Sequence, residues 1–158
     1  FTKNEIIINT DGKPWRPVIH IKDVCNAIYA GIVAPLNIVN GQIYNLGIYG
    51  GNYTVKQIAL NAKKVMKNCN LRIVNNHRDP RSYKVSFKKI YDELHLYYKP
   101  KYTLRYGGEE ILNFFKKIKF SKKHYEGQKT NRLMRLKYLI KTRKLNKNLK
   151  LKTNSSYA

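Results

Sequence analysis

The chain has 158 residues, of which 42% are hydrophobic and 12% aromatic, enough to bury one modest core. No apolar run approaches the roughly 20 residues that a membrane span needs, which excludes an integral membrane protein. The formal net charge of +23 is large for this length and raises the hypothesis of a nucleic-acid partner.

The first predicted elements are strand, strand and helix. Residues 5–9 form a short apolar run that ends in a turn, where Gly12 is free to adopt a positive φ. A second strand is predicted over residues 18–21. Asp23 occupies an N-cap or first-turn position, and apolar residues recur behind it at helical spacing as far as Pro35.

The next predicted elements alternate in the same way. A third strand is predicted over residues 43–46 and a fourth over residues 71–74, with an amphipathic helix capped by Thr54 between them. Residues 83–87 alternate as an edge strand does. Two further helices are predicted, over residues 88–95 and up to about Ile118.

Strands separated by helices indicate an α/β fold. The strands are few, and the sequence opens in a strand with no helix before it. We therefore expect an incomplete sheet that is part of a larger domain, with residues 1–118 as its main portion and residues 119–158 as a basic extension.

The positive charge is concentrated in this extension. Residues 1–115 carry a net charge of +9, and residues 116–158 carry +14. A basic amphipathic helix is predicted over residues 130–144, and such a helix can dock on a membrane, a nucleic acid or an acidic partner. The alternative, which we favour, is that its leucines cap the fold while its charges face water, with only weak, non-specific polyanion binding. The excess of lysine over arginine fits an AT-rich genome as well as a polyanion partner.

A search for catalytic and metal-binding motifs finds none. The sequence contains neither a GxGxxG nor a GxxxxGK[ST] phosphate-binding loop, and its four histidines have no metal-ligand spacing. Cys25 and Cys69 form no CxxC pair, so neither a disulfide framework nor a thiolate zinc site is expected. With no signal-peptide pattern, the chain is predicted to be cytoplasmic.

The remaining candidates are residues suited to phosphate binding. Arg16 stands between Trp15 and Pro17 at a rigid strand start, which would aim a bidentate guanidinium. In a polar loop, Asp79 lies between Arg78 and Arg81, where a carboxylate could accept ribose hydroxyls while the arginines hold a diphosphate. The alternative for each residue is a solvated loop charge.

Five segments, in order, resemble a known family. They are Gly12-Lys-Pro-Trp-Arg-Pro-Val-Ile-His-Ile-Lys-Asp-Val, Gln42-Ile-Tyr-Asn-Leu-Gly, Tyr53-Thr-Val-Lys-Gln-Ile-Ala, Asp79-Pro-Arg-Ser-Tyr-Lys-Val-Ser-Phe-Lys-Lys-Ile and Tyr102-Thr-Leu-Arg-Tyr-Gly-Gly-Glu-Glu-Ile. Together they resemble the C-terminal half of the extended short-chain dehydrogenases/reductases, which include NAD-dependent nucleotide-sugar epimerases and dehydratases. The tail segment that begins at Arg132 resembles that of one dehydratase-like branch, which favours a docked helix.

The resemblance implies a substrate-binding role. Arg16 would contact the diphosphate of a nucleotide-sugar, Asp79 and Arg81 would line the nucleotide end, and Asn45 would shape the pocket floor. His20 and Asp23 match the motif as a strand-end packing group and a helix cap. These follow from the matching positions alone.

The resemblance also implies what other residues would supply. The family's glycine-rich loop, its catalytic Ser or Thr and its Tyr-x-x-x-Lys pair precede the matched region. NAD or NADP would therefore be bound by a missing N-terminal Rossmann half, and this segment would bind no cofactor and turn over no substrate alone. Two alternatives remain open: a non-catalytic basic nucleic-acid-binding module, or an inactive truncated relic.

Overall fold

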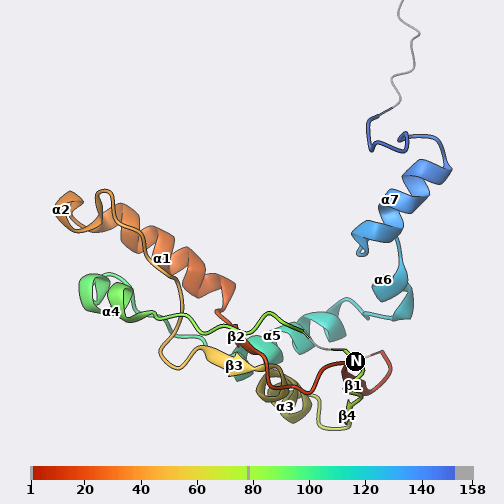
Figure 1. The fold of residues 1–158 in the computed structure, drawn as a ribbon, viewed down its shortest axis with the longest axis horizontal. Helices are drawn as coiled ribbons and strands as arrows, with labels where there is room; N and C mark the ends of the chain where they lie inside the picture. Colours follow the sequence, from red (N-terminus) through yellow and green to blue (C-terminus); the bar gives the residue numbers. More distant parts are fainter. Residues whose placement is uncertain (1, 78, 152–158) are drawn as a thin grey trace, which may run out of the picture. The chain divides into compact units, whose positions relative to one another are not determined.

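The computed structural model describes residues 2–77 and 79–151 (Figure 1). Residues 3–77 and 79–114 form one compact unit, and residues 115–151 belong to a second. The elements of the first unit are β1 (Glu5–Ile8), β2 (Trp15–Pro17), α1 (Ile21–Val33), α2 (Leu36–Val39), β3 (Asn52–Thr54), α3 (Val55–Val65), β4 (Asn70–Ile73), α4 (Lys88–Leu94) and most of α5 (Leu104–Lys117). None of the helices in the described ranges is long and apolar enough to cross a membrane.

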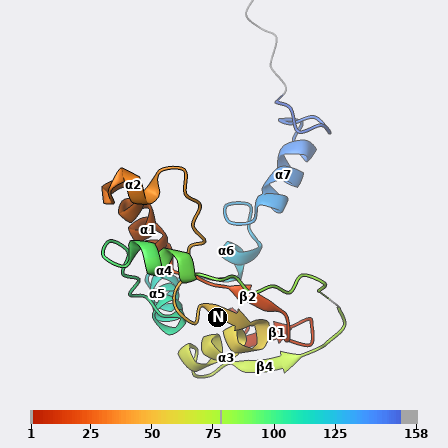
Figure 2. The ribbon, with the colours of Figure 1, turned by 60° about the vertical axis from the view of Figure 1, so that its left-hand side comes forward.

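Two small sheets organise the first unit. β1 and β4 pair in parallel, with Glu5 opposite Asn70 and Ile8 opposite Ile73. β2 and β3 pair antiparallel, with Trp15 opposite Thr54. A parallel pair needs a crossover connection, and α3 is the helix of that crossover that contacts β1, β3 and β4 (Figure 2).

The start of α3 is fixed by local sequence. Thr54 is its N-cap and accepts a hydrogen bond from the Gln57 N–H at 3.1 Å, while the Gln57 side chain accepts one from the Thr54 N–H at 2.8 Å. This capping box confirms the predicted helix start. The Gly12 carbonyl accepts a bond from the Lys56 N–H, and Gly12 has the positive φ, 77°, expected of the turn.

The core of the unit lies between α1 and α4. Small residues on one face of α1 (Ala27, Ala30 and Ala34) allow close packing against Phe87, Ile90, Leu94 and Tyr98. The Tyr98 hydroxyl, fully buried, donates to the Gly47 carbonyl at 2.9 Å. A Cβ atom at Gly47 would lie 2.2 Å from the Phe87 ring, so this position has room only for glycine.

The opposite face of α1 carries large apolar side chains that are exposed. They are Ile21, Ile28, Tyr29, Ile32 and Val33, continued by Leu36 of α2. We call these six residues the α1 stripe. A helix normally turns its large apolar residues toward the core, so the α1 stripe is a surface that this unit leaves uncovered.

The N-terminus of α1 confirms the first turn, one of the two predicted positions of Asp23, and corrects its assignment as the helix cap. His20, not Asp23, is the N-cap, and its Nδ1 accepts a hydrogen bond from the Lys22 N–H at 3.2 Å. Asp23 lies in the first turn, fully buried, and its carboxylate accepts bonds from the backbone N–H groups of Lys101 and Tyr102 at 2.9 and 3.0 Å. Asp23 therefore ties α1 to the segment that precedes α5.

Three predicted strands are wrong. Residues 18–21 do not form a strand, because β2 ends at Pro17 and α1 begins at Ile21. Residues 43–46 form none, and within the described chain residues 43–47 make no backbone-to-backbone hydrogen bond. Residues 83–87 also stay outside a ladder, since the Asn52 side-chain amide bonds both the N–H and the carbonyl of Val85 at 2.9 Å. A strand requires a neighbouring backbone, which the sequence pattern cannot supply.

The second unit contains α6 (Lys122–Glu126) and α7 (Arg132–Lys141). α7 lies inside residues 130–144, where a helix was predicted, and Asn131 caps it by accepting a bond from the Met134 N–H at 3.1 Å. The Leu139 carbonyl accepts bonds from the N–H groups of Lys144 and Leu145, and Leu145 is buried. The chain thus folds back on the end of α7.

Candidate functional site

Arg16 lies in the middle of β2, opposite Tyr53 in the ladder. Its Nη1 donates to the backbone carbonyls of Trp15 and Arg81, and its Nη2 donates to Asp79 Oδ2 at 2.6 Å. The guanidinium also lies 5.8 Å from the centre of the Tyr83 ring. Arg16 therefore fixes the loop that contains Asp79 and Arg81 against the strand.

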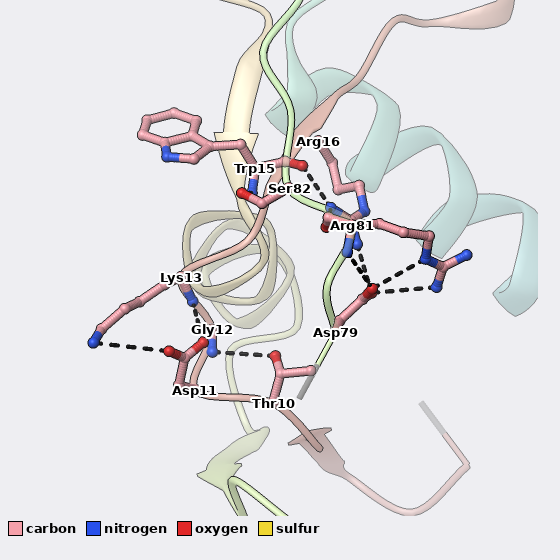
Figure 3. Close-up of polar contacts among 9 residues, drawn as sticks. All are labelled: Thr10, Asp11, Gly12, Lys13, Trp15, Arg16, Asp79, Arg81 and Ser82. Carbon is pink, nitrogen blue, oxygen red and sulfur yellow. Dashed lines mark hydrogen bonds and ion pairs between the residues drawn. The ribbon is translucent and has the colours of Figure 1, made fainter. Parts of the chain in front are cut away.

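Asp79 is the centre of this arrangement (Figure 3). Its Oδ1 accepts from the N–H and Nε of Arg81 at 3.1 and 3.0 Å, and its Oδ2 accepts from Nη2 of Arg81 at 3.2 Å and from Arg16. A carboxylate has about four acceptor positions, and all are used. We call Arg16, Asp79 and Arg81 the arginine–aspartate cluster.

The two arginines stabilise the charged form of the carboxylate. Hydrogen bonds from the side chain and the backbone N–H of Arg81, together with the charges of both guanidinium groups, lower the pKa of Asp79 to about 2. In turn, the Asp79 carboxylate raises the pKa of Arg81. The cluster keeps one negative and two positive charges at neutral pH.

The members of the cluster differ in their access to solvent. The side chains of Arg16 and Asp79 are 22% and 20% exposed, whereas that of Arg81 is 78% exposed. Three of the five N–H groups of Arg16 have partners in the described part of the chain, and the other two have none there. An incoming anion would therefore meet Arg81 first.

The cluster lines a cavity of about 480 Å³ between β1 and α3. The rest of the lining is largely apolar and includes Ile6, Ile8, Val55 and Ile58. Asp79 also lines a second cavity of about 510 Å³, together with Lys13, His77 and Ser82. The arginine–aspartate cluster thus borders a half-apolar space of a size that can hold a small ligand.

The sequence-predicted site residues are only partly brought together. Arg16, Asp79 and Arg81 meet, and both arginines donate to the carboxylate. The prediction for Arg78 falls outside the described residues. Asn45 lies apart from the cluster, and its side-chain amide donates to the Ser86 carbonyl at 3.2 Å.

Sequence reasoning missed a second charged group in the first unit. His20 Nε2 lies 2.8 Å from Glu110 Oε2, and Lys22 Nζ lies 2.5 Å from Glu110 Oε1. These hydrogen bonds lower the pKa of Glu110 and raise that of Lys22. His20 also stacks on Tyr102, with ring centres 4.6 Å apart. Glu110 is 90 residues from His20, so no local spacing could have revealed this contact.

The N-termini of α1 and α3 do not resemble a phosphate loop. In α3 the N–H groups of Val55, Lys56 and Gln57 donate to Pro14, Gly12 and Thr54 of this chain. In α1 the N–H groups of Lys22, Asp23 and Val24 all donate to His20. A dinucleotide site needs such N–H groups to be available to a pyrophosphate, so these residues do not fit one.

No group of three or more potential metal-ligating side chains occurs in the ranges 2–77 and 79–151. Cys25 is exposed and Cys69 buried, and both are free thiols.

Comparison with known proteins supports the family resemblance. A family model described as the NAD dependent epimerase/dehydratase family matches residues 2–47. Similar solved structures include L-threonine dehydrogenase from Phytophthora infestans, with 13% identity, a TM-score of 0.58 and coverage of 73% of this chain and 38% of that one. UDP-glucuronic acid 4-epimerase from Bacillus cereus, in complex with UDP-glucuronic acid and NAD, has 18% identity, the same TM-score, and coverage of 73% and 37%.

A third similar structure is the PbgP3 protein from Burkholderia pseudomallei, with 17% identity, a TM-score of 0.55 and coverage of 73% and 36%. This chain therefore spans less than two fifths of the length of these relatives. Its α/β fold resembles part of the Rossmann-like epimerases of the extended short-chain dehydrogenase/reductase family, as the sequence predicted.

Proposed function

We propose that this chain is the nucleotide-sugar-binding portion of an NAD(P)-dependent epimerase or dehydratase. The observation that carries the proposal is the arginine–aspartate cluster at the edge of the 480 Å³ cavity. Its residues come from two of the five segments that resemble the family. Arg16 and Asp79 are 63 residues apart in sequence, yet Arg16 Nη2 lies 2.6 Å from Asp79 Oδ2.

The geometry supports a division of roles within the cluster. Arg81 is exposed and presents a guanidinium fork, which is suited to bidentate contact with a phosphate group. Arg16 has two N–H groups left to add a second contact. Asp79, whose acceptor positions are filled, acts as a positioning residue that holds both forks. This replaces the sequence-based hypothesis that Asp79 accepts ribose hydroxyls, because a hydroxyl would have to displace an arginine.

The nicotinamide cofactor of the parent enzyme would be held by residues other than those described. The cofactor supplies reversible hydride transfer, which oxidises a sugar hydroxyl transiently. The α1 and α3 N-termini do not fit its pyrophosphate, and the sequence carries no glycine-rich loop. We therefore expect no NAD binding and no turnover from this chain alone.

The α1 stripe supports the association with a larger fold. Its six large side chains are exposed, with Ile32 at 74% and Leu36 at 78%. The matched part of this chain spans less than two fifths of the length of relatives of this fold. We expect the remaining Rossmann half to cover the α1 stripe, in the cytoplasmic setting predicted from the sequence.

Titration calorimetry of the purified chain with uridine diphosphate tests the site. We expect measurable binding of the diphosphate, weaker binding of uridine monophosphate, and loss of affinity in Arg81→Ala. Arg72→Ala is the matched control, since Arg72 is an exposed arginine of β4 that pairs with Glu5 at 3.0 Å and does not line the cavity. Equal losses of diphosphate affinity in the two variants would show an effect of net charge alone and would reject the site. The absence of diphosphate binding in the wild type would also reject it.

A further inference from the structure

The second unit is strongly and uniformly basic. Residues 115–151 contain 14 lysines and arginines against one acid, Glu126. Within that range the only ion pair joins Lys122 and Glu126, at 3.8 Å. Such a density of uncompensated positive charge attracts a polyanion at a rate and affinity that depend on ionic strength.

The same unit contains a column of aromatic rings. The rings of Phe115 and Phe120 are stacked, with centres 4.3 Å apart and planes inclined by 13°. The ring of His124 continues the column at 5.6 Å from Phe120, inclined by 26°. His124, the last ring of the column, is exposed.

Hydrogen bonds fix the orientation of that last ring. The N–H of Ser121 donates to His124 Nδ1 at 3.2 Å, and the Ser121 hydroxyl lies 2.9 Å from the same nitrogen. Because Nδ1 is an acceptor, the ring proton of neutral His124 is on Nε2, which is the nitrogen left to donate to a ligand. Five exposed lysines surround the column in sequence: Lys116, Lys117, Lys119, Lys122 and Lys123.

We propose that residues 115–124 bind single-stranded nucleic acid, with an unpaired base stacked on His124 and the five lysines along the phosphate backbone. Cationic side chains interleaved with stacking rings are the combination that holds single strands without sequence preference. This site shares no residue with the arginine–aspartate cluster and goes beyond the proposed sugar-binding function.

An anionic membrane is the less favoured occupant. A membrane-surface helix needs an apolar face along its length. In α7, the longest helix wholly within this unit, the strongly exposed large apolar side chains are Leu133 and Met134, both in the first turn. Leu136, Leu139 and Ile140 are half-buried, which leaves little apolar surface for lipid.

Fluorescence anisotropy with labelled 15-nucleotide oligo(dT) and oligo(rU) tests the proposal on the full chain. Affinity for both single strands should fall about 100-fold between 50 and 200 mM salt, as five phosphate contacts imply. His124→Ala should weaken single-strand binding about fivefold or more and leave binding of a duplex of equal charge within twofold. His124→Phe loses the hydrogen bonds to Ser121 but keeps a stacking ring, so it should bind single strands more tightly than His124→Ala.

A pair of charge-matched variants separates the site from net charge. Lys116→Gln, Lys117→Gln and Lys119→Gln together should reduce single-strand affinity at least tenfold. Lys63→Gln, Lys64→Gln and Lys67→Gln remove the same charge from exposed positions in and just after α3 and should reduce it less than threefold. The proposal is overturned if the two triple variants lose affinity equally, or if His124→Ala binds single strands as tightly as the wild type. It is also overturned if the chain binds phosphatidylserine vesicles more tightly than either oligonucleotide.

Discussion

The guanidinium of Arg16 and the carboxylate of Asp79 meet at 2.6 Å, with each side chain about one fifth exposed. This ion pair links strand β2 to the loop that follows β4, two segments that are distant in sequence. Because Arg16 and Asp79 both line the cavity, a substitution that removes their ion pair also alters the surface that a ligand would contact.

Replacing Arg16 should weaken ligand binding more than it changes the fold. Arg16→Ala removes a charge-assisted contact worth about 1.5–3 kcal/mol, which corresponds to a loss of about 10- to 150-fold in affinity for a nucleoside diphosphate. Arg16→Lys should recover only part, since an ammonium group cannot form a fork. Calorimetry with each variant measures the loss, and circular dichroism verifies the fold. If Arg16→Ala binds within twofold of the wild type, Arg16 has only a structural role.

The Asp79 carboxylate should titrate at an unusually low pH. Its pKa is lowered to about 2, so the ion pairs with the arginines are complete at neutral pH and contribute to stability there. As the pH falls from about 4 toward 2, Asp79 becomes protonated and that contribution is lost. Carbon-detected NMR of the side-chain carboxyl should give a midpoint near 2. In Arg81→Gln the midpoint should rise, and an unchanged midpoint would show that Arg81 does not hold the charge.

The capping box at Thr54 should contribute measurably to stability. Thr54→Ala removes the acceptor for the Gln57 N–H and should lower the free energy of unfolding by about 0.5–2 kcal/mol. Thr54→Ser keeps a hydroxyl at the same place and should stay near the wild type. Urea denaturation followed by circular dichroism compares the variants. Equal stabilities for Thr54→Ala and Thr54→Ser would contradict a role for the cap.

Two positions on α1, two residues apart, should respond in opposite ways. Ile32, 74% exposed in the α1 stripe, should accept Ile32→Asp with a change in the free energy of unfolding within about 0.5 kcal/mol. Ala30 is fully buried against α4, so Ala30→Leu should overpack the core and destabilise it by about 1–3 kcal/mol.

Light scattering should show in addition that Ile32→Asp raises the concentration at which the isolated chain self-associates. Strong destabilisation by Ile32→Asp would mean that the α1 stripe is part of the core.

Local patterns predicted the helices well and the strands unevenly. The helix that starts at Thr54 was predictable, because the cap and the apolar face are encoded within a dozen residues. The strand expected at residues 43–46 was not formed, although its sequence pattern is that of a buried strand. Ladder formation depends on a second backbone, and nothing within a short window of sequence specifies where that backbone is.

The candidate site shows the same division. The contact between Asp79 and Arg81 spans two residues and could be anticipated from their spacing. The contact between Asp79 and Arg16 spans 63, and only the order of the family-like segments suggested that both belong to one site. The pairing of His20 with Glu110 was not anticipated, although both residues lie in family-like segments, because the sequence indicated only a packing role for His20 and no role for Glu110.

The segment that fails to form a strand has one further consequence. Tyr98 holds the Gly47 carbonyl and Ser86 holds the Asn45 amide, so side chains and neighbouring backbone restrain residues 43–47. A strand that arrived beside this segment would meet backbone whose conformational freedom is already reduced. Pairing would then proceed with a smaller entropic penalty than the pairing of two disordered segments. The unpaired backbone of residues 43–47 is also an edge to which a second copy of the chain can add. The isolated unit should therefore dimerise or aggregate through these residues as its concentration rises.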